Sequence, residues 1–564
     1  MDTTTIRLGE TLRMLSARGF ITTKYVSGGG RIFEGDLHCN SGTVRVQVCL
    51  DDWDFISYPR ITLISKPAFL PSLMAHVDVL NGLCYFSPGS VVLDRYDPAT
   101  AVAQCLDQAT TVLEKIVSDP KYCSDDFQDE FLTHWVYGQL SPPWPVVLCS
   151  TSSENAYCEY YLVGDAPERK AVIATNYADV QILATTLGCA PPKTSRCKCW
   201  LFRTERRPVL PDDAMPATIK ELFFWLKKWD FALYNNIQRV LEREKEYLNA
   251  AFVTFAIDTP KGWIGFGFEL DQMMRLGYRD APKRFKQYLH RKGGLKPIFR
   301  VDITDIRADF IHSRNLVFKD LKEKRLTLVG CGAIGGYLVQ ALVRLGAGTG
   351  CRGELVLIDS DTIGAENLGR HYLGMTALFK SKAEALRQEI YRQFPYVRIS
   401  VQTQAVRATS KFFTGDLIID ATGEEAVSEM INENHLRQKI KVPPVLYVWI
   451  KGNGECVQSL FVDSKRHGCF RCLRLPDTNR FREERFPTIR RPPQRQNFGC
   501  RSFTPYAVSA PMHAASLATD AVIDWMKGDP SPRFRTRYIE KTDAKIVKNQ
   551  NISPLKECQA CGSQ

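Results

Sequence analysis

The stretch Leu326-Thr327-Leu328-Val329-Gly330-Cys331-Gly332-Ala333-Ile334-Gly335-Gly336 joins a short β-prone run to a G-x-G-x-x-G loop. Gly330, Gly332 and Gly335 allow the backbone to turn sharply and to approach a phosphate. A helix beginning at this loop offers free N–H groups and the positive end of its dipole. The stretch therefore predicts a nucleotide loop. It leaves the nucleotide open, and a dinucleotide oxidoreductase is the default alternative.

Strand-like and helix-like segments alternate around this loop. Alternation of this kind is typical of a mostly parallel, doubly wound sheet, so we predict an α/β domain over residues 314–564. Its strands are expected at 325–329, 354–358 and 416–419, and its helices at 337–345 and 382–394.

Polar residues beyond the second of these strands favour a triphosphate over a dinucleotide. Asp359 ends that strand, where a carboxylate suits a ribose hydroxyl, and Asp361 follows it closely. Asn367, Arg370 and Lys382 then bring an amide and two cations toward the loop. Guanidinium and ammonium groups stabilise charge that develops on phosphates during transfer. This set fits the breaking of a triphosphate and does not fit a dehydrogenase.

With these elements, residues 314–564 resemble the adenylyltransferases of the ubiquitin-activating, molybdopterin- and thiamine-biosynthesis superfamily. The resemblance implies ATP and Mg²⁺ as cofactors and adenylation of a protein C-terminus. It places Asp359 at the ribose and Asn367, Arg370 and Lys382 at the triphosphate. It also implies a homodimer through the adenylation domain.

One position departs from the family pattern. The family has a metal-binding Asp in a Thr-Asp element after its fourth strand, and here Gly423 stands in that place. Three alternatives remain open for the metal: Glu424, Glu425, or Asp361 together with water.

Two C-x-x-C pairs suggest a structural metal site. The first pair is Cys469 and Cys472, and the second is Cys558 and Cys561. Four thiolates form a closed tetrahedral Zn²⁺ site, and a redox role for either pair is the alternative. Similar pairs occur in the molybdopterin and thiamine branches of the superfamily. We expect the zinc to attach the C-terminal tail to the adenylation domain.

Cys500 lies between these pairs, and Arg495 and Arg501 flank it in sequence. Cations near a thiol favour the nucleophilic thiolate. The segment that follows resembles the one after the thioester-forming cysteine of activating enzymes. We therefore predict Cys500 as the first thioester nucleophile. A buried, inert cysteine is the alternative.

A second candidate nucleophile, Cys84, follows an Asn81-Gly82 turn. A lone cysteine is usually a small core residue. In context, this stretch resembles the active site of ubiquitin-conjugating enzymes, whose His-Pro-Asn appears here as His76-Val77-Asp78. The Asn that supports an oxyanion is absent from its place. We predict an α+β conjugating-like domain over residues 1–140, with helices at 8–18 and 98–117 and strands at 42–50 and 60–65.

Residues 141–313 are expected to form a mixed α/β linker region. It contains strand candidates at 146–149, 171–174 and 253–257 and a long amphipathic helix over 218–250. We expect Cys197-Lys198-Cys199 to lie in a loop, because a single residue separates the two cysteines and no second pair is near. No catalytic constellation is visible in this region.

Composition narrows the class of protein further. The chain has 564 residues, 44% hydrophobic and 24% charged, which is ordinary globular usage. The N-terminus has no export signal and the uncharged run 326–343 is rich in glycine, so we expect a cytoplasmic protein without a membrane span. Its eighteen cysteines are then not expected to form disulfides. The net charge of +12 is mild and no basic–aromatic pattern accompanies it, so we expect no nucleic-acid partner.

The order of conjugating-like, middle and activating-like regions resembles the fused enzymes of bacterial anti-phage CBASS operons. That resemblance implies transfer of a partner's C-terminal acyl group from Cys500 to Cys84 and then to a target lysine. The implied partner is a cyclic-GMP-AMP-synthase-like nucleotidyltransferase. Two alternatives remain: a sulfur-carrier adenylyltransferase without conjugating activity, and a non-catalytic nucleotide-binding scaffold.

Overall fold

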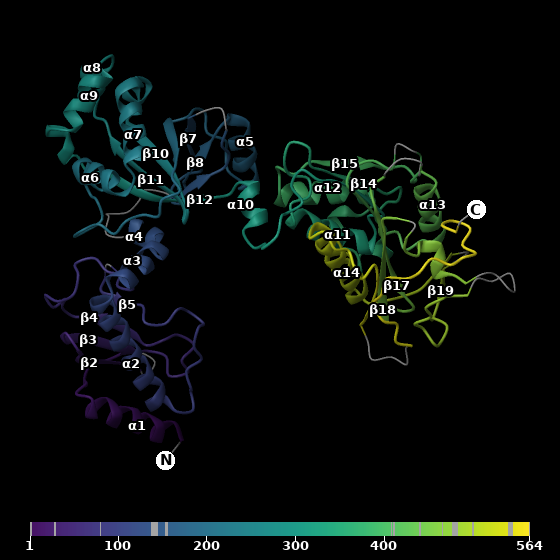
Figure 1. The fold of residues 1–564 in the computed structure, drawn as a ribbon, viewed down its shortest axis with the longest axis horizontal. Helices are drawn as coiled ribbons and strands as arrows, with labels where there is room; N and C mark the ends of the chain where they lie inside the picture. Colours follow the sequence, from purple (N-terminus) through teal and green to yellow (C-terminus); the bar gives the residue numbers. More distant parts are fainter. Residues whose placement is uncertain are drawn as a thin grey trace. The chain divides into compact units, whose positions relative to one another are not determined.

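The computed structural model describes residues 3–26, 30–78, 80–136, 145–152, 156–407, 409, 412–438, 442–464, 466–475, 483–498, 501–539 and 545–562. The chain divides into two compact units, Met1–Asp305 and Ile306–Gln564 (Figure 1). The boundaries expected after residues 140 and 313 stay predictions.

A five-stranded antiparallel sheet in the order β1-β2-β3-β4-β5 begins the first unit. Strand β3 alternates between buried and half-exposed residues, which gives the sheet one apolar face. Helix α2 packs against β2 and contributes Ala101, Cys105 and Leu106 to the core. Its N-cap is Asp97, which accepts a hydrogen bond from the N–H of Thr100. The elements are α1 (Thr3–Ala17), β1 (Ile21–Tyr25), β2 (Arg31–Cys39), β3 (Gly42–Leu50), β4 (Arg60–Leu63), β5 (Gly82–Leu83), α2 (Pro98–Ser118), α3 (Pro120–Asp129) and α4 (Phe131–Val136).

The rest of the first unit is built on a closed seven-stranded barrel in the order β10-β11-β12-β6-β8-β7-β9. Trp135 of α4 joins it to the N-terminal sheet: its Nε1 donates to the carbonyl oxygens of Gly265 (3.0 Å) and Val301 (3.1 Å), and its ring stacks on Trp225. The elements are β6 (Val146–Leu148), β7 (Tyr157–Val163), β8 (Lys170–Ala174), α5 (Tyr177–Thr186), β9 (Cys197–Arg203), α6 (Ile219–Trp229), α7 (Phe231–Arg243), η2 (Glu246–Asn249), β10 (Phe252–Thr259), β11 (Gly262–Glu269), α8 (Gln272–Tyr278), α9 (Pro282–Leu289), η3 (Lys292–Leu295) and β12 (Phe299–Asp305).

The single helix predicted over 218–250 is wrong. The segment forms two helices, α6 and α7, separated by Asp230 in an extended conformation. The carboxylate of Asp230 accepts hydrogen bonds from the N–H groups of Ala232 and Leu233 and so caps α7. Apolar residues at helical spacing continue through the break, which is why periodicity alone did not reveal it.

The loop predicted at Cys197-Lys198-Cys199 is also wrong, because these residues begin strand β9. Cys197 and Cys199 point into the protein, and Lys198 ion-pairs with Glu246 and lies over the ring of Tyr157. The alternation of buried and partly exposed residues is that of a strand, and the short spacing of the cysteines follows from it.

The second unit contains a seven-stranded sheet in the order β15-β14-β13-β16-β17-β18-β21. The first five strands of this order, β15, β14, β13, β16 and β17, are mutually parallel. Strands β18 and β21 then add to the sheet in antiparallel orientation. The predicted doubly wound, mostly parallel sheet is confirmed. The elements are α10 (Ala308–Ser313), β13 (Arg325–Val329), α11 (Ala333–Arg344), β14 (Glu354–Ile358), η4 (Ala365–Asn367), η5 (Met375–Ala377), α12 (Lys382–Gln393), β15 (Ile399–Gln402), β16 (Leu417–Asp420), α13 (Glu425–Leu436), β17 (Val445–Lys451), β18 (Cys456–Val462), η6 (Phe470–Leu473), β19 (Gln496–Phe498), β20 (Arg501–Phe503), α14 (Ser509–Met526) and β21 (Phe534–Tyr538).

Both faces of this sheet are buried, as parallel sheets require. Leu328 and Leu357 belong to a core that α11, α12 and α14 complete, whereas Ile358 and Ile418 face a second core with α13. The alternate residues of each central strand therefore serve opposite layers, and the strands read as continuous apolar runs.

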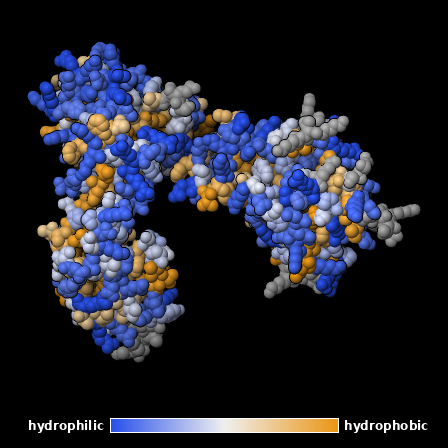
Figure 2. Space-filling model, in the orientation of Figure 1, coloured by the Kyte–Doolittle hydropathy of each residue, from blue (hydrophilic) through white to orange (hydrophobic). Residues whose placement is uncertain are grey.

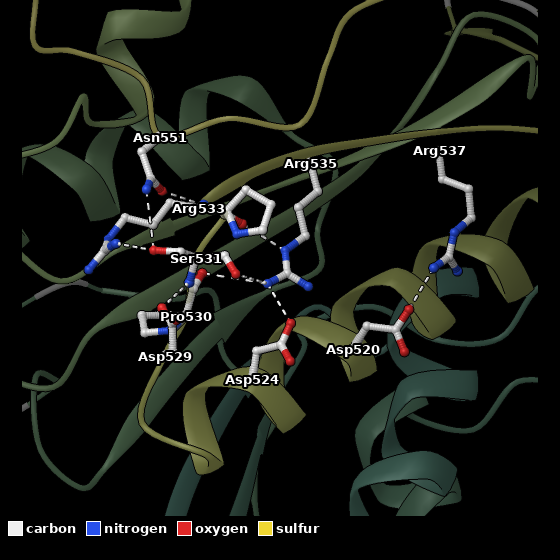
Figure 3. Close-up of polar contacts among 10 residues, drawn as sticks. Asp520, Asp524, Asp529, Pro530, Ser531, Arg533, Arg535, Arg537 and Asn551 are labelled. Atoms are coloured by element: carbon white, nitrogen blue, oxygen red, sulfur yellow. Dashed lines mark hydrogen bonds and ion pairs between the residues drawn. The ribbon is translucent and has the colours of Figure 1, made fainter.

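Ion pairs attach the edge strand β21 to its neighbours. Figure 3 shows Arg535 and Arg537 pointing toward Asp524 and Asp520 of α14, with N–O distances of 2.7 and 2.5 Å. Arg535 is buried and also donates to the carbonyl oxygen of Pro532. These contacts hold the last strand against the helix that packs with α11.

On the face shown in Figure 2, hydrophilic residues predominate, with small apolar patches among them. Among the helices of the described residues, none is long and apolar enough to cross a membrane.

Candidate active site

The carboxyl ends of β13, β14 and β16 meet at one edge of the second unit's sheet. Strand β13 pairs with β14 on one side and with β16 on the other, so the strand order reverses there. Ligands of open α/β sheets bind at such a switch point. An open cleft of about 1010 Å³ lies at this edge. Its lining includes the predicted residues Gly330, Gly332, Asp359, Asp361, Asn367, Arg370 and Lys382.

The three motif glycines do different things in the loop. Gly330 has a φ of +89°, and a Cβ there would lie 2.8 Å from the backbone nitrogen of Thr422. A Cβ at Gly335 would lie 1.9 Å from the carbonyl oxygen of Gly330, so the tight turn excludes a side chain. At Gly332, no described atom lies within 4 Å of a Cβ position. Gly332 therefore leaves open the space in front of α11 that a phosphate needs.

The peptide of Cys331, in the middle of the loop, is held from both sides. Its N–H donates to Oδ2 of Asp359 (2.7 Å), and its carbonyl oxygen lies 2.8 Å from Nε2 of His371. Nδ1 of His371 accepts from the N–H of Leu373 (3.0 Å), so Nε2 carries the hydrogen that Cys331 accepts. Burial lowers the pKa of His371, which agrees with a neutral ring. Sequence reasoning missed His371, although it directly follows Arg370 in the same motif.

A lysine and an acid form a pair at the mouth of the cleft. Lys382 begins α12 and is 9% exposed, and its Nζ lies 2.8 Å from Oδ2 of Asp361. The side chain of Asn367 accepts from the N–H of Gly364 at 3.0 Å, which closes the turn η4. The three residues are thereby positioned in the cleft by local contacts.

Arg370 lies against two aromatic rings from a later part of the chain. Its guanidinium carbon is 5.0 Å from the ring centre of Tyr506 and 5.9 Å from that of Phe503. Within the described part of the chain, no carboxylate pairs with it. An Arg held on aromatic faces keeps its donors available for an anion.

Cys500 itself lies outside the described residues. Strand β19 ends at Phe498 and β20 begins at Arg501. Residues on both sides of this position line the cleft, namely Arg495, Ser502, Phe503, Thr504 and Tyr506. The chain therefore passes the nucleotide cleft immediately before and after the predicted nucleophile.

The acids near Gly423 differ in their availability to a metal. Glu424 is exposed and lines the cleft. Glu425 ion-pairs with Arg474, whose Nε donates to its Oε1 at 2.8 Å. Asp420 is buried, and its oxygens accept from Thr422 and Ser428. Asp361 also lines the cleft and is ion-paired with Lys382. Among the three candidate acids in the described residues, Glu424 is therefore the one that lines the cleft outside an ion pair, and carboxylate oxygens are ligands that Mg²⁺ prefers.

The four cysteines predicted as a metal site come together. Cys469, Cys472, Cys558 and Cys561 are buried, and all four sulfurs lie within 4.8 Å of one another. The closest sulfur pairs are 3.4, 3.8 and 3.9 Å apart. Metal–sulfur bonds of about 2.3 Å in a tetrahedron place sulfurs about 3.8 Å apart, so the cluster fits one Zn²⁺.

Backbone and side-chain donors complete the surroundings of this cluster. The N–H of Leu555 lies 3.4 Å from the sulfur of Cys472, and Nδ2 of Asn432 lies 3.5 Å from that of Cys469. Such donors stabilise thiolate ligands and fix their orientation. Through the four cysteines, the C-terminal segment joins η6 and α13.

Cys84 is exposed and follows strand β5 in the first unit. Its N–H donates to the carbonyl oxygen of His76 (2.7 Å), and its sulfur lies within 4.8 Å of His76 and of a Glu130 carboxylate oxygen. Sequence reasoning missed Glu130, which follows α3 and is remote in sequence. The acids 126 and 130, one helical turn apart, were the available signal.

Asp78 takes the place of the family's oxyanion-supporting Asn. Its Oδ1 accepts from the N–H groups of Leu80 and Gly82, each at 2.8 Å, and so closes the turn before Cys84. A carboxylate engaged in this way has no hydrogen to donate to an oxyanion. Asn81 is half-buried in that turn, with a φ of +61°.

These arrangements agree with two family matches. Residues 305–560 match the ThiF family, and residues 14–139 match Prokaryotic E2 family B. The chain thus joins an adenylyltransferase unit of the ubiquitin-activating type to a domain of the ubiquitin-conjugating type. The predicted fusion is confirmed.

Two relatives are similar to this chain over most of its length. The chain is 30% identical over 527 residues to the "ATP-dependent ubiquitin transferase-like protein Cap2" of Pseudomonas aeruginosa (strain BWHPSA011 / Pa011), covering 91% of each chain. It is 24% identical to the Escherichia coli (strain TW11681) protein of the same name, covering 92% of each. Escherichia coli MccB is a solved structure with a weaker likeness: 17% identity, a TM-score of 0.34, and coverage of 46% of this chain and 67% of that one. The chain belongs to the family of Cap2 ATP-dependent ubiquitin transferase-like proteins.

Proposed function

We propose that the protein adenylates the C-terminal carboxylate of a partner protein and passes the acyl group through Cys500 and Cys84 to a target lysine. The observation that carries this proposal is the composition of one cleft. It combines a phosphate-type glycine loop, the cations Arg370 and Lys382, and the chain on both sides of Cys500. An activated carboxylate would form in this cleft, and the segments that precede and follow Cys500 in the sequence line the same cleft.

In the first reaction, a carboxylate oxygen of the partner attacks the α-phosphorus of ATP and pyrophosphate leaves. The open N-terminus of α11 suits the phosphates, and Asp359 retains lone pairs for the ribose hydroxyls. Arg370 and Lys382 stabilise the negative charge on the departing pyrophosphate. Asn367 lines the same cleft and offers its amide N–H₂ group to the triphosphate.

Two metal ions belong to this proposal. Asp361 and Glu424 would hold Mg²⁺, which supplies charge neutralisation of the phosphates. The four clustered cysteines would hold a structural Zn²⁺ that attaches the C-terminal segment to the sheet.

The thioester steps then follow. The thiolate of Cys500 attacks the acyl adenylate and releases AMP, after which the thiolate of Cys84 takes the acyl group by exchange. A target lysine finally receives it as an amide. Dividing one acyl transfer among successive nucleophiles makes each step easier.

The order of the conjugating-type and activating-type regions supports a proposal for the partner. We propose a cyclic-GMP-AMP-synthase-like nucleotidyltransferase as the activated protein, in cytoplasmic anti-phage defence, with the enzyme acting as a homodimer through its adenylation unit. A protein C-terminus fits both parts of the chain, because its carboxylate can be adenylated in the cleft and its acyl group can then pass to the conjugating-type domain.

The order of the two thiols tests this function. With ATP and the nucleotidyltransferase, Cys84→Ala should still form a thiol-sensitive adduct at Cys500 but no stable conjugate. Cys500→Ala should form neither, while ATP–pyrophosphate exchange continues. Non-reducing gels with and without thiol, and mass spectrometry of the adduct site, measure both outcomes.

Cys351→Ala is the control, because Cys351 is an exposed cysteine of the second unit that does not line the cleft. It should leave adduct and conjugate unchanged. A normal yield of stable conjugate from Cys84→Ala would overturn the conjugating step and favour a sulfur-carrier adenylyltransferase.

A further inference from the structure

The imidazole of His76 is surrounded by acids. Nε2 lies 2.9 Å from Oδ2 of Asp126 and 2.9 Å from the hydroxyl of Tyr122. Nδ1 lies 3.0 Å from Oε1 of Glu130, while the other oxygen of Glu130 accepts from the backbone N–H of His76 at 3.0 Å. Both ring nitrogens therefore lie close to carboxylate oxygens of Asp126 and Glu130.

The backbone of His76 is also unusual. Its φ of +61° lies in the left-handed region, which disfavours a residue with a side chain. The carbonyl oxygen of the same residue accepts the N–H of Cys84. This conformation brings ring and carbonyl together at the cysteine, and strain of this kind is common at functional sites.

These contacts give the ring a positive charge. The contacts with Cys84 and Glu130 raise the pKa of His76 to about 10 against the opposing effect of burial, and Asp126 adds to the rise. For Glu130, burial alone would raise the pKa, but the neighbouring imidazoles of His134 and His76 and the backbone N–H of His76 outweigh it and lower the pKa below its usual range. At neutral pH the site thus holds an imidazolium against anionic carboxylate.

We propose that His76, held between Asp126 and Glu130, is a catalytic residue whose imidazolium stabilises the Cys84 sulfur both when it accepts the acyl group and when it leaves. Asp126 and Glu130 are positioning residues, since they act on the sulfur through the ring. This inference rests on the proposed conjugating function and adds the group that carries charge in it.

The chemistry balances without a further reactant. In the first step, the Cys84 thiolate forms a bond to the acyl carbon as the bond to the Cys500 sulfur breaks, so one thiolate replaces another. In the second, the neutral amine of lysine bonds to the carbon, its proton goes to solvent, and the Cys84 thiolate leaves. His76 keeps its proton throughout and acts by its charge, which is strongest where water is partly excluded.

This role does not require the Asn of the family pattern, whose place Asp78 takes. Asp78 closes the turn and has no hydrogen to donate to an oxyanion. His76 would instead lower the energy of the reaction by stabilising the sulfur of Cys84 as it leaves. The other ionisable groups around the ring are Tyr122, with Lys115 over its face, and His134 beside Glu130 at 3.7 Å.

Alkylation of Cys84 tests the charge without any partner protein. Full-length protein is treated with iodoacetamide at pH 7, and mass spectrometry follows each cysteine. His76→Gln should slow alkylation of Cys84 by about tenfold, because the thiolate loses the neighbouring cation. His76→Lys should recover part of the rate, because a cation returns near the sulfur. Exposed Cys351 in the second unit serves as the internal reference.

His38→Gln is the matched control, since His38 is an exposed histidine of the same sheet. It should not change the rate. Asp126→Asn and Glu130→Gln should each slow alkylation by a smaller factor, which provides readings should His76→Gln fold poorly. Equal alkylation rates in wild type and all three site variants would overturn the proposal.

A short peptide bearing a C-terminal mercaptoethanesulfonate thioester tests catalysis directly. It should acylate Cys84 faster than Cys351 in the wild type, and free lysine should then discharge the adduct. Both rates should fall in His76→Gln. Unchanged acylation and discharge in that variant would overturn the catalytic role, even if conjugation through Cys84 proceeds. Loss of conjugation in Cys84→Ala remains the separate test of the proposed function.

Discussion

The nucleotide cleft and the Cys84 site are assembled in different ways. In the cleft, residues 330–382 supply the glycine loop, two acids and the two cations, and later segments add Glu424 and the aromatic rings beside Arg370. The parallel strands bring their carboxyl ends to one edge. At Cys84, the neighbouring His76 contacts Asp126 and Glu130, which lie beyond helix α2 in the sequence. A site whose main groups lie in one stretch of sequence can be predicted from its motif. A site completed by a remote segment needs the fold.

The cysteine cluster differs from both sites, because its two C-x-x-C pairs are remote from each other in sequence and yet were predictable. Cys558→Ser should remove the metal and lower the stability of the second unit by about 4 kcal/mol or more, since loss of a metal is among the largest single-residue effects. Elemental analysis should find one zinc per chain in the wild type and little in the variant. The melting temperature should fall by about 8 °C or more.

Cys351→Ser, at an exposed cysteine of the same unit, should retain both metal and stability. A metal-free wild type with full activity would show that the four sulfurs do not form a zinc site.

Substitution of the two cations of the cleft tests their predicted role in adenylation. Lys382→Ala or Arg370→Ala should reduce partner-dependent ATP–pyrophosphate exchange by about 10²–10³, the usual result of removing one group that stabilises transition-state charge. Lys380→Ala is the control, because Lys380 is exposed and adjacent in sequence but does not line the cleft. Exchange at the wild-type rate in both cleft variants would contradict the assignment.

The smallest effect is expected from the pH dependence of the Cys84 site. The contribution of His76 to stability is complete below its ordinary pKa of 6.5 and is lost as the pH rises through about 10. That of Glu130 is complete above its ordinary value of 4.5 and is lost as the pH falls through its lowered pKa. Wild type should therefore exceed His76→Gln most between pH 4.5 and 6.5, by a few degrees in melting temperature.

A thermal scan of both proteins across this range measures the difference. The difference in melting temperature between wild type and His76→Gln should become smaller above pH 6.5 and below pH 4.5. A difference that grows from pH 6.5 to 10 would mean that the ring is neutral in the folded protein.

The doubly wound sheet, the nucleotide loop and the grouping of cysteines 469, 472, 558 and 561 could all be predicted from residue order alone. Each depends on a short spacing or on periodicity, which the backbone converts directly into geometry. The fusion with a conjugating-type domain was also predictable, because Cys84 lies in a local stretch that follows the family pattern.

Which of these charged and polar groups remain available for chemistry depends on the folded chain. It engaged Glu425 with Arg474 and left Glu424 at the cleft, and it placed His371 on the glycine loop. It broke the helix expected over 218–250 at Asp230. The sequence gives the residue type of a carboxylate or an imidazole but not its surroundings. Its charge and its availability depend on burial and on hydrogen-bond partners that the folded chain brings from elsewhere.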